Sequence, residues 1–147
     1  MQRRIRLGMV GGGQGAFIGA VHRIAARIDD EYALVAGALS SDPQRARDSG
    51  AALHLAPDRC YSDYRAMAQA EAARADGIEA VAIVTPNHLH APVATAFMEA
   101  GIHVICDKPL GISLAEGQAL AALAQQKNLL FALTHTCLLY TSDAADE

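Results

Sequence analysis

Short apolar runs alternate with helical stretches along almost the whole chain, and this alternation constrains the fold more than any other feature. The runs typical of strands cover residues 5–10, 32–40, 78–84, 102–106 and 129–134. Most of the stretches between them have the length and spacing of helices that cross from one strand to the next. Strands joined in this way pair in parallel, with right-handed connections. The sequence therefore predicts an α/β fold, a doubly wound parallel sheet of the Rossmann-like kind.

Short signals mark where the predicted helices begin. Ser41 or Asp42 caps the second helix, with Pro43 at its first position. Ser113 and Glu116 have the spacing of a capping box ahead of the last helix. The first helix is indicated by apolar residues at helical spacing, with two arginines off their stripe: Phe17, Val21, Ile24 and Ile28, with Arg23 and Arg27 outside it.

A glycine-rich loop lies between the first predicted strand and the first predicted helix. In "GMVGGGQGAFIGA", the pattern G-x-G-x-x-G/A is matched by Gly11, Gly13 and Ala16, with Gly19 a second candidate for the closing small residue. Such glycines allow the tight turn, let a pyrophosphate approach the main chain, and let the helix pack on the strand. The alternative is a purely structural glycine turn; a P-loop is excluded because no Gly-Lys-Ser/Thr follows. The candidate cofactor-binding residues of the loop are Gly11, Gly12, Gly13, Gln14, Gly15 and Ala16.

The end of the second predicted strand carries hydroxyl and guanidinium groups. An NAD-binding fingerprint has an acid there for the ribose 2′-hydroxyl, whereas an arginine accommodates the 2′-phosphate of NADP. This chain has Ser40 and Ser41 at that point, Asp42 slightly later, and Arg45 one turn further on. Two hydroxyls and a guanidinium fork suit a phosphate, so we expect NAD or NADP with a modest preference for NADP. In the alternative interpretation, Ser41 and Asp42 only cap the helix.

Two further loops with unusual residues follow later strands. "TPNHLH", residues 85–90, and "DKP", residues 107–109, come directly after apolar runs. Ligands of a doubly wound sheet bind beyond the carboxyl ends of its strands, where all three loops should meet. Asp107 and Lys108 are therefore predicted to be functional, rather than parts of a solvated loop. No Cys or carboxylate stands at ligand spacing from His88 and His90, so no metal is predicted.

In order and spacing, these motifs resemble the glucose–fructose oxidoreductase, inositol dehydrogenase and rhizopine-catabolism (Gfo/Idh/MocA) family. The resemblance covers residues 3 to about 136. The family pattern Thr-Pro-Asn-x-x-His is matched by Thr85, Pro86, Asn87 and His90. The pattern Gly-x-His-Val-x-x-Glu-Lys-Pro is matched by Gly101, His103, Val104, Lys108 and Pro109, with Asp107 in place of the usual Glu.

The resemblance implies an activity and a role for each motif. It makes Lys108 the catalytic lysine, reaching the nicotinamide ribose and the substrate hydroxyl. The reaction implied is hydride transfer between a nicotinamide cofactor and a sugar, polyol or related hydroxyl compound. A nucleotide-sensing regulator and an NAD-assisted glycosidase are alternatives within the family, and the lysine favours an enzyme over a sensor. Both motifs are expected to contact the cofactor, through Thr85, Pro86, Asn87, His90, Asp107, Lys108 and Pro109.

Members of the family also carry a second α/β domain, which supplies acid–base residues, the substrate pocket and the oligomer interface. This chain stops where that domain should begin, so residues 1–136 are expected to form the dinucleotide-binding domain alone. We expect the parent protein to be a homo-oligomeric enzyme and this chain to be inactive by itself. The last residues, 137–147, resemble the translation of a sequencing adapter and are expected to be non-native.

Composition argues against several other functions. The 147 residues carry a net charge of −4 with histidine neutral, and they include no Trp. Lys and Arg are scattered, which disfavours a nucleic-acid or membrane-surface partner. No apolar stretch approaches the length of a membrane span. Three cysteines without paired spacing predict a reducing, cytoplasmic setting.

Overall fold

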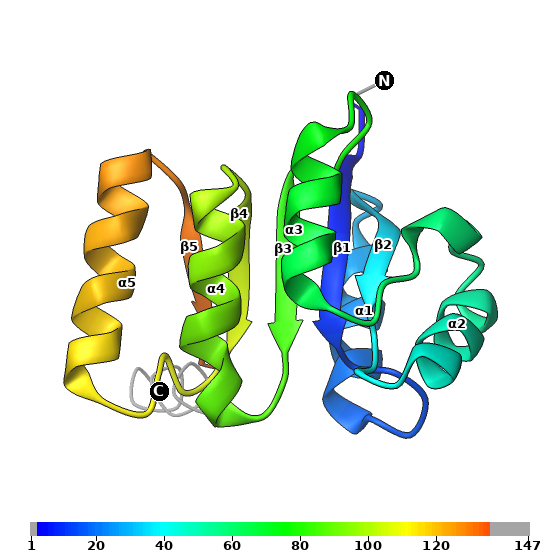
Figure 1. Cartoon of the computed structure of the whole chain (residues 1–147), viewed down its shortest axis with the longest axis horizontal. Helices are drawn as coiled ribbons and strands as arrows, with labels where there is room; N and C mark the ends of the chain where they lie inside the picture. Colours follow the sequence, from blue (N-terminus) through cyan, green and yellow to red (C-terminus); the bar gives the residue numbers. More distant parts are fainter. Residues whose placement is uncertain (1–2, 136–147) are drawn as a thin grey trace, which may run out of the picture.

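The computed structural model of the protein describes residues 3–135. Within that range, five parallel strands form one sheet in the order β2-β1-β3-β4-β5 (Figure 1). The predicted doubly wound α/β fold is confirmed, and the strand order reverses direction beside β1. The strands are β1 (Ile5–Gly11), β2 (Tyr32–Ala38), β3 (Ala80–Val84), β4 (His103–Asp107) and β5 (Phe131–Thr134). The helices are α1 (Phe17–Ile28), α2 (Pro43–Ala52), α3 (Tyr64–Ala73), α4 (His90–Glu99) and α5 (Leu114–Lys127), with 3-10 turns η1 (Pro57–Arg59) and η2 (Asn87–Leu89).

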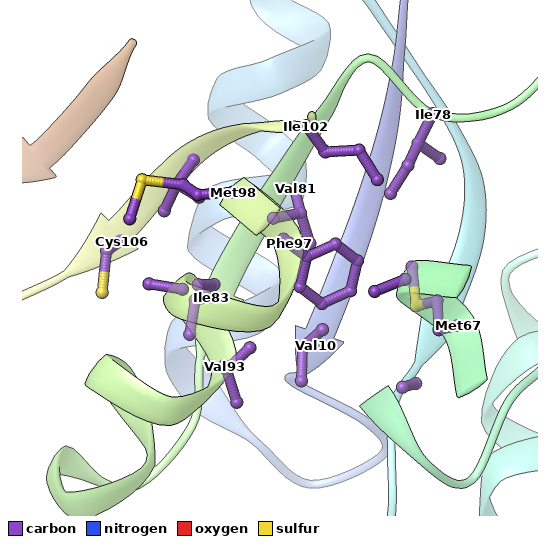
Figure 2. Close-up of a cluster of buried hydrophobic side chains, with 14 of the residues drawn as sticks. Val10, Met67, Ile78, Val81, Ile83, Val93, Phe97, Met98, Ile102 and Cys106 are labelled. Carbon is purple, nitrogen blue, oxygen red and sulfur yellow. The ribbon is translucent and has the colours of Figure 1, made fainter. Parts of the chain in front are cut away.

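Helices cover both faces of the sheet. α3, α4 and α5 lie on one face and α1 lies on the other (Figure 1). In the larger buried cluster, the ring of Phe97 from α4 lies among side chains of β1, β3 and α3, including Val10, Val81 and Met67 (Figure 2). β3 is buried along its whole length, as expected of a central strand covered on both faces.

The helix caps agree with the signals in the sequence, with one shift. Asp42 is the cap of α2, because its carboxylate accepts a hydrogen bond from the N–H of Arg45 at 2.7 Å. The hydroxyl of Ser113 caps α5 by accepting the N–H of Glu116 at 3.2 Å. In a capping box, the Glu116 carboxylate would accept the N–H of the cap residue, Ser113. Here it accepts the N–H of the preceding residue, Ile112, at 2.8 Å.

The apolar stripe that marks α1 in the sequence points away from the sheet. Phe17, Ile24 and Ile28 are 82%, 55% and 74% exposed. Gly19 is the buried residue of this helix, and a Cβ added to it would lie 2.5 Å from the Cα of Gly12. Close approach of two backbones therefore seats α1, together with Ile18 and Ala26, which are partly buried against the sheet.

A buried ion pair attaches the irregular segment before α3 to the rest of the domain. Glu71 of α3 is 1% exposed and forms a two-pronged pair with Arg59, which is 6% exposed. The same carboxylate accepts hydrogen bonds from the hydroxyl of Tyr61 at 2.9 Å and from the N–H of Ile78 at 3.1 Å. All the oxygen lone pairs of this carboxylate therefore face donors, which is the condition under which a buried charge is tolerated.

Candidate dinucleotide-binding and active site

Three loops meet at the carboxyl edge of the sheet, which is the lower edge in Figure 1. They follow β1, β3 and β4 and contain residues 11–16, 85–90 and 107–109. β1 and β3 are neighbours, with Gly11 opposite Val84, so the first two loops leave the sheet side by side. The strand order reverses here, and a reversal of this kind is where doubly wound sheets bind ligands. The convergence expected from the sequence is thus present.

The glycine loop runs so close to its neighbours that side chains do not fit. Gly12 has a positive φ of 72°, a conformation that favours glycine. A Cβ on Gly13 would lie 2.6 Å from the carbonyl oxygen of Leu39, at the end of β2. The turn closes where the N–H of Ala16 donates to the Gly13 carbonyl at 3.0 Å. Both requirements of the fingerprint, a special backbone conformation and close approach, apply at this loop.

Two side chains outside the fingerprint hold the loop in place. The guanidinium of Arg23, on α1, donates to the Gly12 carbonyl at 2.7 Å. Burial lowers the pKa of this guanidinium, and the charge of Arg27 lowers it further. The hydroxyl of Ser49, on α2, accepts the N–H of Gln14 at 3.2 Å. The glycine loop, called the glycine cradle below, is therefore held by a residue of α1 on one side and a residue of α2 on the other.

Two adjoining hollows open beside the glycine loop. The smaller has a volume of about 250 Å³ and is bounded by the loop backbone, Ser40, Arg45 and Ser49. The larger, of about 520 Å³, extends past Ser41. Thr85 and Pro86 line both hollows, so the loop after β3 forms their common wall. The larger hollow is also lined by Leu89, from the loop after β3, and by three residues that the motifs did not indicate, Ser62, Tyr64 and Val93.

The acid and the lysine of the third loop have different surroundings. Lys108 is exposed. The carboxylate of Asp107 is half-buried, accepts the hydroxyl of Thr134 at 3.0 Å, and lies 4.0 Å from Nε2 of His22 on α1. Burial lowers the pKa of His22, and the charge of Asp107 opposes that shift. The acid is thus engaged with the protein itself, whereas the lysine next to it is accessible to a ligand.

His90 lies beneath the loops and does not line either hollow. It is 1% exposed. Its Nδ1 lies 2.6 Å from the carbonyl oxygen of Pro109, and its Nε2 lies 3.0 Å from the carbonyl oxygen of Thr85. Both ring nitrogens therefore face backbone atoms of the protein, which differs from the direct cofactor contact that the family resemblance implies.

The predicted site residues fall into two groups. Those that line the hollows are Gly11, Gly12, Gly13, Gln14, Ala16, Ser40, Ser41, Arg45, Thr85 and Pro86. Those at the same edge but outside the walls of the two hollows are Gly15, Asn87, His90, Asp107, Lys108 and Pro109.

Within residues 3–135, no three His, Cys, Asp or Glu side chains gather in a way that could hold a metal ion. The same part of the chain contains no helix with the length and apolar character needed to cross a membrane.

A family model described as "Oxidoreductase family, NAD-binding Rossmann fold" matches residues 5–135. The chain belongs to the Gfo/Idh/MocA oxidoreductase family. The resemblance noted in the sequence is thereby confirmed, and the domain built around the glycine loop is the NAD-binding Rossmann domain of that family.

Solved structures and curated relatives agree with this membership. An oxidoreductase from Sinorhizobium meliloti is 61% identical with a TM-score of 0.86, over 91% of this chain and 37% of that one. An inositol dehydrogenase homologue from Azotobacter vinelandii, complexed with NADH and myo-inositol, is 46% identical with a TM-score of 0.88, over 91% and 35%. The uncharacterized oxidoreductase YfiI of Bacillus subtilis is 43% identical over 92% of this chain and 35% of its own length. The chain thus spans little more than a third of each of these relatives.

Proposed function

We propose that the parent protein is an enzyme that transfers hydride between a nicotinamide dinucleotide and the hydroxyl-bearing carbon of a sugar, polyol or related compound. The observation that carries this proposal is the glycine cradle at the reversal of strand order, with an exposed Lys108 on a loop at the same edge. When bound, the nicotinamide ring would accept or donate the hydride. The myo-inositol in the structure of the Azotobacter homologue supports a polyol as substrate.

The residues that line the two hollows suit the parts of a dinucleotide. The smaller one is bounded by the loop backbone and lies beside the start of α1, where N–H groups and the helix dipole attract phosphate. The larger one is lined by the apolar side chains of Leu89 and Val93, together with Tyr64. We assign the pyrophosphate to the first hollow and the adenosine to the second.

The role proposed for Lys108 is to bind and polarise the substrate hydroxyl. Its ammonium group has three donors and no acceptor, so it can hold the hydroxyl oxygen but cannot take its proton while charged. The proton acceptor is therefore assigned to the part of the parent protein outside this chain. For the same reason we expect this chain to be inactive by itself.

We further propose that the cofactor is NADP in preference to NAD. Ser40, Ser41 and Arg45 stand together at the wall of the larger hollow. Asp42, the acid that could hold a ribose 2′-hydroxyl, has its carboxylate engaged in capping α2. A guanidinium and two hydroxyls suit the extra phosphate of NADP, which a planar fork of donors binds well.

Two measurements test the function. Titration of the purified chain with NADPH and NADH should show binding of both, and Arg45→Ala should weaken NADPH about tenfold while NADH changes little. Equal losses for the two cofactors would contradict the NADP preference. In the full-length parent, Lys108→Met should abolish turnover of polyols while NADPH still binds. Undiminished turnover in that variant would remove Lys108 from the proposed reaction.

The same proposal includes four further points. The domain ends at residue 136, and residues 137–147 are non-native. The parent protein is a homo-oligomer and is located in the cytoplasm. Residues 136–147 lie outside the described residues. Reading the source DNA beyond the codon for Thr136 tests the first two points. A reading frame that continues into a second α/β domain would support them, and a frame that ends after Glu147 would contradict them.

A further inference from the structure

The ring of His90 joins two loops that are separate in the sequence. It lies at the first position of α4, with Nδ1 2.6 Å from the Pro109 carbonyl oxygen and Nε2 3.0 Å from the Thr85 carbonyl oxygen. Thr85 lines both hollows, and Pro109 directly follows Lys108. One buried side chain therefore connects the wall of the cofactor hollows to the turn that carries the lysine.

Each ring nitrogen faces an atom that only accepts hydrogen bonds. An imidazole carries a proton on at least one nitrogen, so at least one of the two contacts is a hydrogen bond that the ring donates. Because the ring is 1% exposed, water cannot replace that bond, and leaving it unmade is costly.

We propose that His90 is a positioning residue for Lys108. Its ring ties the loop after β3 to the loop after β4, and so sets the separation between the cofactor hollows and the lysine. It acts through Thr85 and Pro109 and has no contact of its own with the cofactor. The consequence for the lysine rests on the proposed function, whereas the two contacts of the ring do not.

The first experiment is a spectrum of the histidine rings of the purified chain, recorded by ¹⁵N–¹H correlation at neutral pH and assigned through the bonds of each side chain. We expect a ring N–H proton of His90 to be protected from exchange with water, because it is donated to a buried backbone carbonyl. His88, two residues earlier and exposed, is the matched comparison and should show unprotected ring protons. Rapid exchange of the His90 ring protons with water would overturn the proposal.

The second experiment follows acetylation of Lys108 by mass spectrometry, with and without saturating NADPH. Bound cofactor should slow acetylation in the wild type and in His88→Gln. In His90→Gln, whose flexible amide cannot contact both carbonyls in the geometry of the ring, we expect at least half of this protection to be lost while the circular dichroism spectrum stays native. Full protection in a folded His90→Gln variant would also overturn the proposal.

The outcomes separate this proposal from the proposed function. If the wild-type lysine shows no protection although NADPH binds, the assigned place of Lys108 beside the cofactor is wrong, and the positioning role falls with it. The spectrum of the ring would still decide whether His90 joins the two loops. If His90→Gln loses the native circular dichroism spectrum, the variant His90→Asn with added imidazole replaces it. Failure of imidazole to restore protection in that variant counts against the proposal.

Discussion

The substitution Glu71→Gln tests how strongly the buried ion pair holds the domain together. An amide has no charge, and its NH2 group cannot accept the bonds that the carboxylate now accepts from Arg59, the Tyr61 hydroxyl and the Ile78 N–H. At least one of these donors would lose its partner, and the guanidinium would stay buried without its main counter-charge. Asp76 lies 3.6 Å from that guanidinium but is 63% exposed, so it offsets little.

The expected loss follows from these contacts. Removing one partner of a buried ion pair costs about 3–5 kcal/mol, which is a large part of the roughly 5–15 kcal/mol that stabilises a domain. At roughly 3 °C per kcal/mol for a chain of this size, the thermal midpoint should fall by about 10–15 °C. Urea and thermal unfolding followed by far-ultraviolet circular dichroism would measure both quantities.

Two comparisons sharpen the test. The double variant Arg59→Met, Glu71→Leu should recover part of the lost stability, because apolar side chains replace both charges. The recovery is incomplete because the buried Ile78 N–H then loses its acceptor. In Glu71→Gln the pKa of Tyr61, which burial and then the bond to Glu71 raise to about 12, should move toward its ordinary value of 10. A loss of less than about 1 kcal/mol in Glu71→Gln would refute the reasoning, since that is the range of an exposed pair.

Three further predictions concern packing, the acid limb of stability and the glycine loop. Phe97→Ala should lower the free energy of unfolding by about 3–5 kcal/mol, because the ring of Phe97 is fully buried. Phe17→Ser, at a side chain 82% exposed, should change it by no more than about 0.5 kcal/mol. Equal effects of the two substitutions would contradict the outward orientation of the α1 stripe. Hydrogen bonds from Arg3, then from the N–H of Arg6, lower the pKa of Glu79 to about 2 from 4.5. Its stabilising effect is therefore complete above about pH 4.5 and is lost as the pH falls through 2. In Glu79→Gln the loss of stability over that interval should be smaller by up to about 1 kcal/mol, because the pair is partly exposed, and an unchanged acid limb in urea titrations would contradict this. Gly19→Val should abolish NADPH binding, measured by calorimetry, because its Cβ would lie 2.5 Å from the backbone of Gly12 and displace the cradle; wild-type affinity in that variant would show that α1 can shift without disturbing the loop.

Much of the architecture can be predicted from local patterns in the chain. The alternation of apolar runs and helical stretches predicts the order of the elements, because period and length are properties of neighbouring residues. Parallel strands place their carboxyl ends at one edge, so the glycine loop, Thr85 and Lys108 are expected near one another once the order is known. The glycine cradle is predictable for the same reason. Its glycines allow a backbone conformation and a close approach that larger residues do not, and they lie within one short segment of the chain.

Other features depend on contacts between distant segments. The apolar stripe of α1 suggests a face turned toward the sheet, yet the helix sits on Gly19 and leaves Phe17 exposed. Arg23 resembles a solvent-facing residue of an amphipathic helix, but it reaches the Gly12 carbonyl. Which face of a helix meets the sheet depends on where two backbones can approach most closely, and that distance is not encoded in helical spacing.

The sequence by itself determined the family, the parallel sheet, and the loops that carry the cradle and the lysine. Only the tertiary structure decided that Asp42, rather than Ser41, caps α2 and that the ring of His90 faces two carbonyl oxygens. The physical reason is that hydrogen-bond partners are chosen by distance and direction in space. Two histidines in the same short motif, His88 and His90, therefore differ completely in exposure and in the role we assign to them.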